Sequence, residues 1–369
     1  MCNVKLIGEF TAFRLYLYPL FKHRPHYFVM NARLRDTFNF LRKATPRRVG
    51  NAAKVLGGYY YSRFTKKPYQ MGMPISISIE PTTSCNLRCP ECPSGLRAFS
   101  RPTGMLTPET FGTVIDQLHR ELWYLILYFQ GEPYLNPNFF HFVRAAADKK
   151  IYTATSTNAH YLSKENARKT VESGLDRLII SIDGTTQEVY QSYRIGGKLE
   201  KVLDGTQNLV AAKKELKSAT PHIIFQFLVV EPNRHQIADA TALAAEMGVD
   251  EIRFKSAQVY DYENGNPLIP ADGSYSRYKQ NADGTYSIKN KLENRCWKMW
   301  HSCVITWDGS IVPCCFDKDA THKLGNLKTA TFKNIWQSPD YQRFRGSLLQ
   351  SRKEIDICQN CTEGGTVWL

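Results

Sequence analysis

The 369-residue sequence contains no uninterrupted apolar run of about 18 residues, so no membrane-spanning helix is expected. It also lacks a convincing signal peptide, because Glu9 and Arg14 interrupt the apolar patches near the N-terminus and no small-residue cleavage site follows them. We therefore expect a cytoplasmic protein in a reducing compartment. The composition, 43% hydrophobic and 22% charged, excludes a disordered or fibrous chain.

Acidic residues are scarce in residues 1–70, which hold fourteen Lys or Arg but only Glu9 and Asp36. This basic aromatic N-terminal extension carries +12 of the formal net charge of +14. One interpretation is that it packs its aromatic side chains on the body of the protein. Another is contact with an acidic partner or with a membrane, which would place the protein peripherally at the inner membrane surface. Nucleic acid is the least favoured partner, because the basic segment contains no recognisable nucleic-acid-binding motif.

From residue 75 onward, short β-rich runs alternate with segments of helical pattern. We predict strands at 75–80, 125–129, 151–157, 177–183, 223–230 and 251–255, and helices at 107–122, 163–173, 199–216 and 234–247. Such alternation indicates parallel strands joined by helical crossovers. The strands are apolar with little alternation, as buried parallel strands are. We predict an α/β fold with a partial (β/α)6 TIM-type barrel over 71–260, with a flat doubly wound sheet as the alternative.

Polar residues collect where successive predicted strands end. Cysteines follow the first strand, 130–133 follow the second, 156–158 end the third and 181–184 end the fourth. Barrel-type α/β proteins build their sites at the carboxyl ends of strands. The sequence therefore predicts one site at this end of the barrel.

The first cysteine group is Cys85, Cys89 and Cys92, with the spacing C-x3-C-x2-C. Zinc usually takes four ligands, and no fourth cysteine or histidine lies nearby in the sequence. Thiolates are the usual ligands of iron–sulfur clusters. Three of them on a four-iron cluster leave one iron open for another ligand.

This motif after the first strand of an α/β barrel resembles the radical S-adenosylmethionine (SAM) superfamily over roughly residues 75–260. Residues 130–133 resemble the family's Gly-Gly-Glu-Pro motif, although a glutamine replaces its first glycine, and Glu91 replaces the aromatic residue that many members carry before the third cysteine. The resemblance implies that residues 130–133 hold the methionine part of SAM, that 156–158 contact its ribose and that Arg194 reaches its carboxylate. The implied SAM-binding residues are Gln130, Gly131, Glu132, Pro133, Ser156, Asn158, Ser181, Asp183 and Arg194.

The second cysteine group is Cys296, Cys314, Cys358 and Cys361, in a cysteine-rich domain over 295–369 that follows a connecting region over 261–294. A glycine at 309, separated from Cys314 by four residues, makes the spacing similar to the SPASM or twitch modules of radical SAM enzymes. That similarity implies an auxiliary 4Fe-4S cluster, with a zinc ribbon as the alternative. Cys303 and Cys315 are surplus, and we interpret them as small buried thiols.

The resemblance implies an oxidoreductase in which a reduced 4Fe-4S cluster cleaves SAM to methionine and a 5′-deoxyadenosyl radical. The radical would take a hydrogen atom from a small-molecule, sugar or peptide substrate, and the auxiliary cluster would assist the oxidation. A flavodoxin or ferredoxin is the implied electron donor. Lys255, Asp261 and Glu263 follow the sixth strand and either contact the substrate or belong to a solvated loop. The alternative function is a zinc-stabilised scaffold or nucleic-acid-binding protein.

Overall fold

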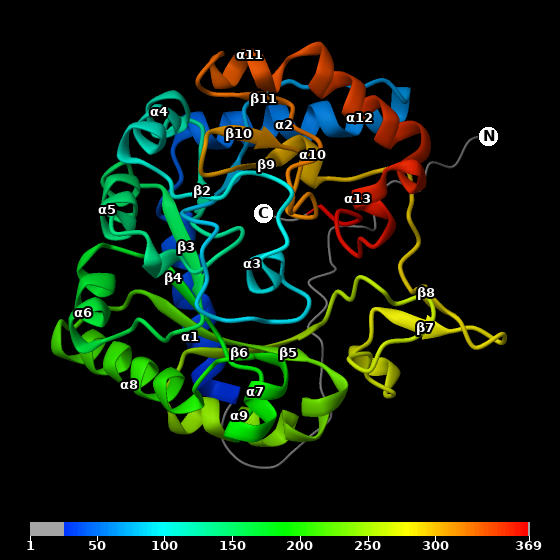
Figure 1. The fold of residues 1–369 in the computed structure, drawn as a ribbon. Coiled ribbons are helices and arrows are strands. Elements are labelled where there is room, and N and C mark those ends of the chain that lie inside the picture. The colour runs from blue at the N-terminus through cyan, green and yellow to red at the C-terminus, as the bar shows by residue number, and fades with distance from the viewer. Residues whose placement is uncertain (1–25, 368–369) are drawn as a thin grey trace, which may run out of the picture.

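The computed structural model describes residues 26–367, and its centre is a nine-stranded sheet that curves into a partial barrel (Figure 1). Six neighbouring strands run parallel and follow one another in sequence order. They are β1 (Ser76–Ile79), β2 (Tyr124–Ile126), β3 (Tyr152–Thr157), β4 (Arg177–Ser181), β5 (His222–Val229) and β6 (Glu251–Ser256). The predicted α/β fold is therefore confirmed.

Helices cover the outer side of this sheet (Figure 1). They are α4 (Pro108–Leu118), α5 (Phe139–Asp148), α6 (Lys164–Glu172), α8 (Leu199–Glu215) and α9 (Ile237–Glu246). Local sequence sets several of their starts: the Thr107 side chain caps α4 by accepting from the Thr110 backbone N–H, and Ser163 caps α6 in the same way. The helix predicted over 234–247 begins instead with the 3-10 turn η2 (Glu231–Gln236).

The C-terminal cysteine region continues the barrel sheet. Strand β9 (Ser302–Ile305) pairs in parallel with β1, in the register Ser76 to Ser302, and then turns into β10 (Ser310–Val312) and β11 (Gly325–Asn326). Strands β9 and β10 form an antiparallel hairpin at an Asp-Gly pair, with Gly309 at a φ of +84°. The helices of this C-terminal region are α10 (Lys298–His301), α11 (Phe332–Trp336), α12 (Pro339–Ser351) and α13 (Asp356–Gln359), and α7 (Gln187–Tyr193) lies between β4 and α8.

A buried ion pair fixes the junction between β1 and β9. Glu80 directly follows β1, and its carboxylate accepts from both terminal nitrogens of Arg101, at 2.5 and 2.8 Å. The Glu80 backbone N–H donates to the carbonyl of Ile305 at the end of β9, at 2.9 Å. The Trp307 N–H donates to the same carboxylate. The polypeptide entering and leaving the first cysteine loop is thereby joined to the C-terminal hairpin.

The connecting region contains a small antiparallel hairpin, β7 (Tyr278–Gln280) and β8 (Tyr286–Ile288), that the sequence did not predict. It is tied to the second cysteine group, because the Tyr278 hydroxyl donates to the Asn360 side chain at 2.9 Å. The Tyr262 ring stacks on the Tyr278 ring with centroids 4.5 Å apart. Residues 261–294 thus contact Cys358–Cys361 through polar groups, and the ring stack braces Tyr278 from within the connecting region.

Helix α1 (His26–Leu41) contacts the residues at the amino ends of the barrel strands. Its Asp36 pairs with Arg177 at the start of β4, and the Tyr152 hydroxyl donates to the same carboxylate. The Phe40 ring stacks on Trp123, with centroids 5.1 Å apart. These contacts support packing on the body for this part of the extension, whereas residues 1–25 lie outside the described residues.

Cations of the extension neutralise acids at the same end of the barrel. Lys43 pairs with Asp176 at 3.0 Å, and Arg33 pairs with Glu251 at 2.8 Å. Burial tends to raise the pKa of Glu251, but hydrogen bonds from His222 and Arg253, with the charge of Arg33, lower it to about 2. Part of the basic excess therefore has a structural role.

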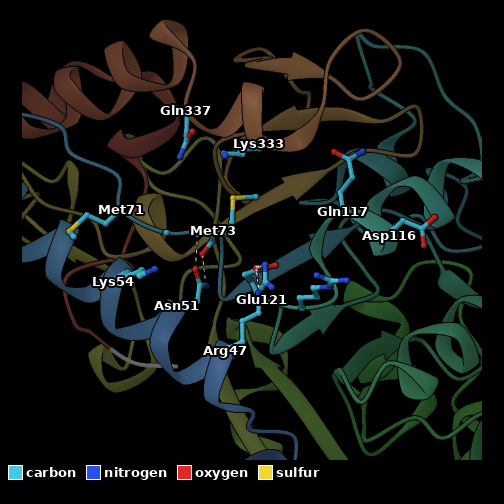
Figure 2. Close-up of a pocket in the computed structure, with 12 residues that line it drawn as sticks. Arg47, Asn51, Lys54, Met71, Met73, Asp116, Gln117, Glu121, Lys333 and Gln337 are labelled. Atoms are coloured by element: carbon cyan, nitrogen blue, oxygen red, sulfur yellow. Dashed lines mark hydrogen bonds and ion pairs between the residues drawn. The ribbon is translucent and has the colours of Figure 1, made fainter.

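Helix α2 (Pro46–Thr65) anchors the extension beside the barrel. The buried Arg48 guanidinium donates to four backbone carbonyls, those of Lys43, His119, Lys149 and Lys150. A neighbouring hollow has a volume of about 540 Å³. At this hollow the Asn51 side-chain amide forms hydrogen bonds with the backbone N–H and carbonyl of Met73, and Arg47 forms an ion pair with Glu121 (Figure 2). No cysteine borders this hollow. Within residues 26–367, no helix has the length and apolar character needed to cross a bilayer.

We predict that Arg48→Met lowers the free energy of unfolding by about 3 kcal/mol, because it leaves several buried carbonyls without a donor. The matched control is Arg47→Met, which removes a half-exposed ion pair and should cost less than about 1 kcal/mol. Urea denaturation under anaerobic conditions measures both values. Equal destabilisation by the two variants would contradict the anchoring role of Arg48.

Candidate active site

The three cysteines of the first group face one cavity at the carboxyl ends of the barrel strands. Cys85, Cys89 and Cys92 line a cavity of about 180 Å³. Their loop is held by a hydrogen bond from the Arg88 N–H to the Ile195 carbonyl, at 2.9 Å, and ends at helix α3 (Pro93–Leu96). Burial raises the pKa of Cys85 to about 11 and raises that of Cys89. Burial thus favours the protonated thiols, whereas a bound metal centre would favour the thiolates.

Each of these sulfurs has a polar neighbour from a later part of the barrel. The Asn158 amide nitrogen lies 3.9 Å from the Cys85 sulfur, and Arg194 Nη1 lies 3.8 Å from the Cys89 sulfur. The Gln130 side-chain oxygen lies 4.0 Å from the Cys92 sulfur. Residues that are far apart in sequence thus converge on the cysteine loop, as predicted from their positions at the strand ends.

The backbone conformation at Gly131 requires glycine. Its φ is +73°, and a Cβ there would lie 2.3 Å from the Thr82 carbonyl oxygen and 2.8 Å from that of Ser84. Its N–H donates to the Ser94 hydroxyl at 2.8 Å. The turn after β2 therefore packs directly against the cysteine loop. The neighbouring position accepts a side chain, which explains how Gln130 can replace a glycine.

Glu132 connects the end of β2 to the end of β3. Its buried carboxylate accepts from the Thr157 hydroxyl at 2.7 Å, from the Asn158 N–H at 2.8 Å and from the Tyr134 N–H at 3.3 Å. Burial raises the pKa of Glu132 to about 7, against the effect of these hydrogen bonds. Glu132 thereby positions Asn158, and Pro133 begins the 3-10 turn η1 (Pro133–Leu135) that follows.

Asp183 orients Arg194. The two side chains form an ion pair, and the other Asp183 oxygen accepts from the Leu228 N–H at 2.7 Å. Asp183 is fully buried and does not border the cavity, whereas Arg194 does. The charge of Asp183, with that of Cys89, keeps the pKa of Arg194 above its usual value despite burial.

The structure separates the predicted SAM-binding residues into two sets. Those that line the cavity are Gly131, Glu132, Ser156, Asn158, Ser181 and Arg194. Gln130, Pro133 and Asp183 do not line it and instead support residues that do. Sequence reasoning missed Ser94, Tyr128, Phe129 and Tyr193, which also line the cavity. The aromatic pair 128–129 had a usable signal, since it directly precedes the predicted motif at the end of β2.

A larger cavity of about 570 Å³, which we call the lumen, borders the cysteine cavity. Tyr128 and Phe129 line both cavities. On the other side, the lumen is bordered by Cys314 and Cys315 and by the charged residues Lys255, Lys298 and Glu363. The lumen therefore extends between the two cysteine groups. Its size suits a small molecule or a part of a larger one.

The second cysteine group gathers around Arg352. Its guanidinium lies 3.2 Å from the Cys361 sulfur and donates to the Glu363 carbonyl at 2.7 Å. Burial tends to lower the pKa of Arg352, but the proximity of Cys296, Cys361 and Cys358 raises it. The pKa of Cys314 is raised by burial and by Cys315, Cys296 and Cys358, which places Cys314 in the same group.

The surplus cysteines lie at the edge of this group. Cys303 is buried on β9, as interpreted from the sequence, and its charged neighbour is Arg345. Cys315 is exposed, contrary to that interpretation, and its sulfur lies 3.7 Å from the Lys298 ammonium. Cys314 and Cys315 lie in the turn that follows β10, in which the Asp317 N–H donates to the Cys314 carbonyl at 3.2 Å.

Among residues 26–367, no three His, Cys, Asp or Glu side chains gather closely enough to hold a single metal ion. A four-iron cluster takes its thiolates at separate corners, so they need not meet at one point. The donor chemistry fits such clusters, since each group offers several thiols beside cationic or amide side chains.

A curved parallel sheet with cysteines at its carboxyl ends and a cysteine-rich extension defines an iron–sulfur enzyme. Residues 79–250 match the sequence model of the radical SAM superfamily, and 296–362 match SPASM, an iron–sulfur cluster-binding domain. The chain belongs to the radical SAM superfamily and carries a SPASM domain.

Several characterised proteins are similar over most of this chain. The AdoMet-dependent heme synthase of Methanosarcina barkeri is 30% identical, over 78% of this chain and 88% of that protein. The cofactor-modifying protein for a tungsten-containing aldehyde ferredoxin oxidoreductase of Pyrococcus furiosus is 26% identical, over 78% and 86%. A solved structure of SuiB from Streptococcus suis bound to S-adenosylmethionine has a TM-score of 0.57 at 13% identity, covering 80% of this chain and 73% of that one.

These matches confirm the predicted radical SAM enzyme and its cofactors, a SAM-binding 4Fe-4S cluster, S-adenosylmethionine and an auxiliary cluster. They favour the enzyme over the zinc-stabilised scaffold or nucleic-acid-binding protein.

We predict that Gly131→Ala weakens SAM binding at least about tenfold, because the added methyl group collides with two carbonyls and displaces the turn against the cysteine loop. Gly284→Ala is the control: its φ is +86°, but nothing lies within 4 Å of an added Cβ. Equilibrium binding to the reconstituted enzyme measures the effect. If the two variants bound SAM equally, the close packing at Gly131 would have no bearing on the site.

Proposed function

We propose that Cys85, Cys89 and Cys92 hold the SAM-binding cluster and that the 180 Å³ cavity beside them holds SAM. The observation that carries this assignment is that one cavity is lined by all three thiols and by side chains from the ends of three later strands. When bound, the reduced cluster supplies the electron that cleaves SAM to a 5′-deoxyadenosyl radical.

The chain's own residues orient SAM and exclude water. Arg194, held by Asp183, presents a guanidinium for the SAM carboxylate, and the backbone around Gly131 receives its amino group. Ser156 and Asn158 offer a hydroxyl and an amide for its ribose hydroxyls. Phe129 separates this cavity from the lumen, so it lies where a hydrogen atom would pass from substrate to the adenosyl group. Apolar walls protect a reactive intermediate from water.

We assign the auxiliary cluster to Cys296, Cys314, Cys358 and Cys361, with Arg352 as a positioning residue. The lumen between the two groups holds the substrate, which is a small molecule, a sugar or a peptide side chain. When bound by these cysteines, the auxiliary cluster would serve as acceptor for the electron that the substrate radical loses in the oxidation. A flavodoxin or ferredoxin supplies electrons to the first cluster.

We predict that the reconstituted enzyme contains about eight irons and that Cys314→Ala lowers this to about four. Cys315→Ala, which changes the adjacent residue, should leave the iron content unchanged, and so should Cys303→Ala. Iron and sulfide analysis of anaerobically reconstituted protein measures these values. Loss of iron in Cys315→Ala but not in Cys314→Ala would reverse the ligand assignment.

Measuring the release of 5′-deoxyadenosine distinguishes the roles of the two cysteine groups. Cys89→Ala should abolish release of 5′-deoxyadenosine with dithionite or reduced flavodoxin as the electron source. Cys358→Ala should retain part of this release, because the first cluster remains. Normal SAM cleavage by Cys89→Ala would contradict the proposed site.

We also propose that the exposed face of α2 rests on an anionic membrane surface. Leu56, Tyr60 and Phe64 lie on one stripe of this helix, and Phe64 is 89% exposed. The nearby cations Lys66 and Lys67 complement anionic headgroups. This stripe lies opposite the buried face of α2, so membrane contact leaves the barrel packing intact.

We predict that the full-length protein co-sediments with vesicles containing phosphatidylglycerol and that the double variant Tyr60→Ser/Phe64→Ser does so several-fold less. Leu34→Ser, which changes an exposed apolar residue of α1, is the control and should bind as the wild type does. Vesicles of phosphatidylcholine alone should bind little protein. Equal sedimentation of wild type and double variant would remove the membrane contact.

A further inference from the structure

The inner face of β6 carries a row of charged side chains. Glu251, Arg253 and Lys255 alternate along the strand and therefore share one face, while Phe254 packs on the opposite face against Phe227. Arg253 donates two hydrogen bonds to the Glu251 carboxylate, at 2.7 and 3.0 Å. Lys255 comes next in the row and borders the lumen. Within residues 26–367, the Lys255 ammonium forms no ion pair and no hydrogen bond.

The surroundings of Lys255 are rich in cations. Burial lowers its pKa, and its leading charged neighbours are Glu363, Arg253, Lys298 and Arg277. The one acid among them, Glu363, is already paired with Lys298. Arg277 adds positive charge next to the end of β6, because its Nε donates to the Ser256 carbonyl at 3.1 Å. Lys255 is exposed on strand β6, and Glu363, the single acid among these neighbours, is shared with Lys298, so the excess of positive charge favours an anionic ligand.

The second cysteine group does not explain the positive charge of Lys255 at the lumen. Cys314 and Cys315 are among the groups that raise the pKa of Lys298, which shows that Lys298 lies close to the second cysteine group. The leading charged neighbours of Lys255 include no cysteine. The charge of Lys298 is therefore available to balance thiolates, whereas that of Lys255 faces the open lumen.

We propose that the substrate of this enzyme carries an anionic group, a carboxylate or a phosphate, that binds to the Lys255 ammonium in the lumen. The proposal rests on the proposed function, because it treats the lumen as the substrate site. A lysine binds either anion as a compact point charge, and a charge-assisted hydrogen bond would fix one end of the substrate. Because Phe129 borders the same lumen, the other end is directed toward the SAM cavity.

The experiment uses the reconstituted enzyme with SAM bound and two probes, inorganic phosphate and succinate, at constant ionic strength. We expect isothermal titration calorimetry to detect saturable binding of at least one probe. Lys255→Met should weaken it at least tenfold, and Lys255→Arg should restore part of the affinity. Lys328→Met, which removes an exposed lysine that does not border the lumen, should bind as the wild type does. The preferred probe identifies the anion as phosphate or carboxylate.

Absence of binding to the wild type, or equal affinity in Lys255→Met, would overturn the proposal. Iron content and uncoupled release of 5′-deoxyadenosine are measured on the same preparations. If both are normal while anion binding is absent, only the anionic substrate is excluded. If 5′-deoxyadenosine is not released by the wild type, the proposed function itself fails.

Discussion

The parallel pairing of β9 with β1 determines how the two cysteine groups are arranged. It places the C-terminal hairpin, which leads to Cys314, beside the strand that leads to Cys85. The Glu80–Arg101 ion pair stabilises this arrangement on both sides of the first cysteine loop. Burial raises the pKa of Glu80, against the effect of Arg101, so the pair depends on each partner. The lumen between the cysteine groups follows from this continuous sheet.

Charge is divided between the two ends of the barrel. At the amino ends of the strands, cations of the extension pair with acids such as Asp176 and Glu251. At the carboxyl ends, Arg194 and Arg352 lie beside the sulfurs of the two cysteine groups, where thiolates bound to clusters would need positive charge. Many basic residues therefore have specific partners at one end of the barrel or the other.

Local patterns predicted the elements and motifs whose information lies in short stretches of sequence. The strand runs, the helices predicted from 107 and from 163, and the cysteine spacings belong to this class. The pairing of β9 with β1 could not be predicted, because it joins residues more than 200 positions apart and leaves no periodic signal. For the same reason, the sequence could not separate Asp183, which supports the site, from Arg194, which lines it.

Glu91, a departure from the family's common pattern, has a structural explanation. Its carboxylate accepts from the Tyr260 N–H at 2.9 Å, which ties the cysteine loop to the segment after β6. Burial raises the pKa of Glu91, against the effect of this bond and of Lys318. An aromatic residue could not accept this hydrogen bond. Since the same segment follows Lys255, the bond links the cysteine loop to the strand that carries the proposed anion site. The cysteine loop and the segment after β6 are therefore in direct contact.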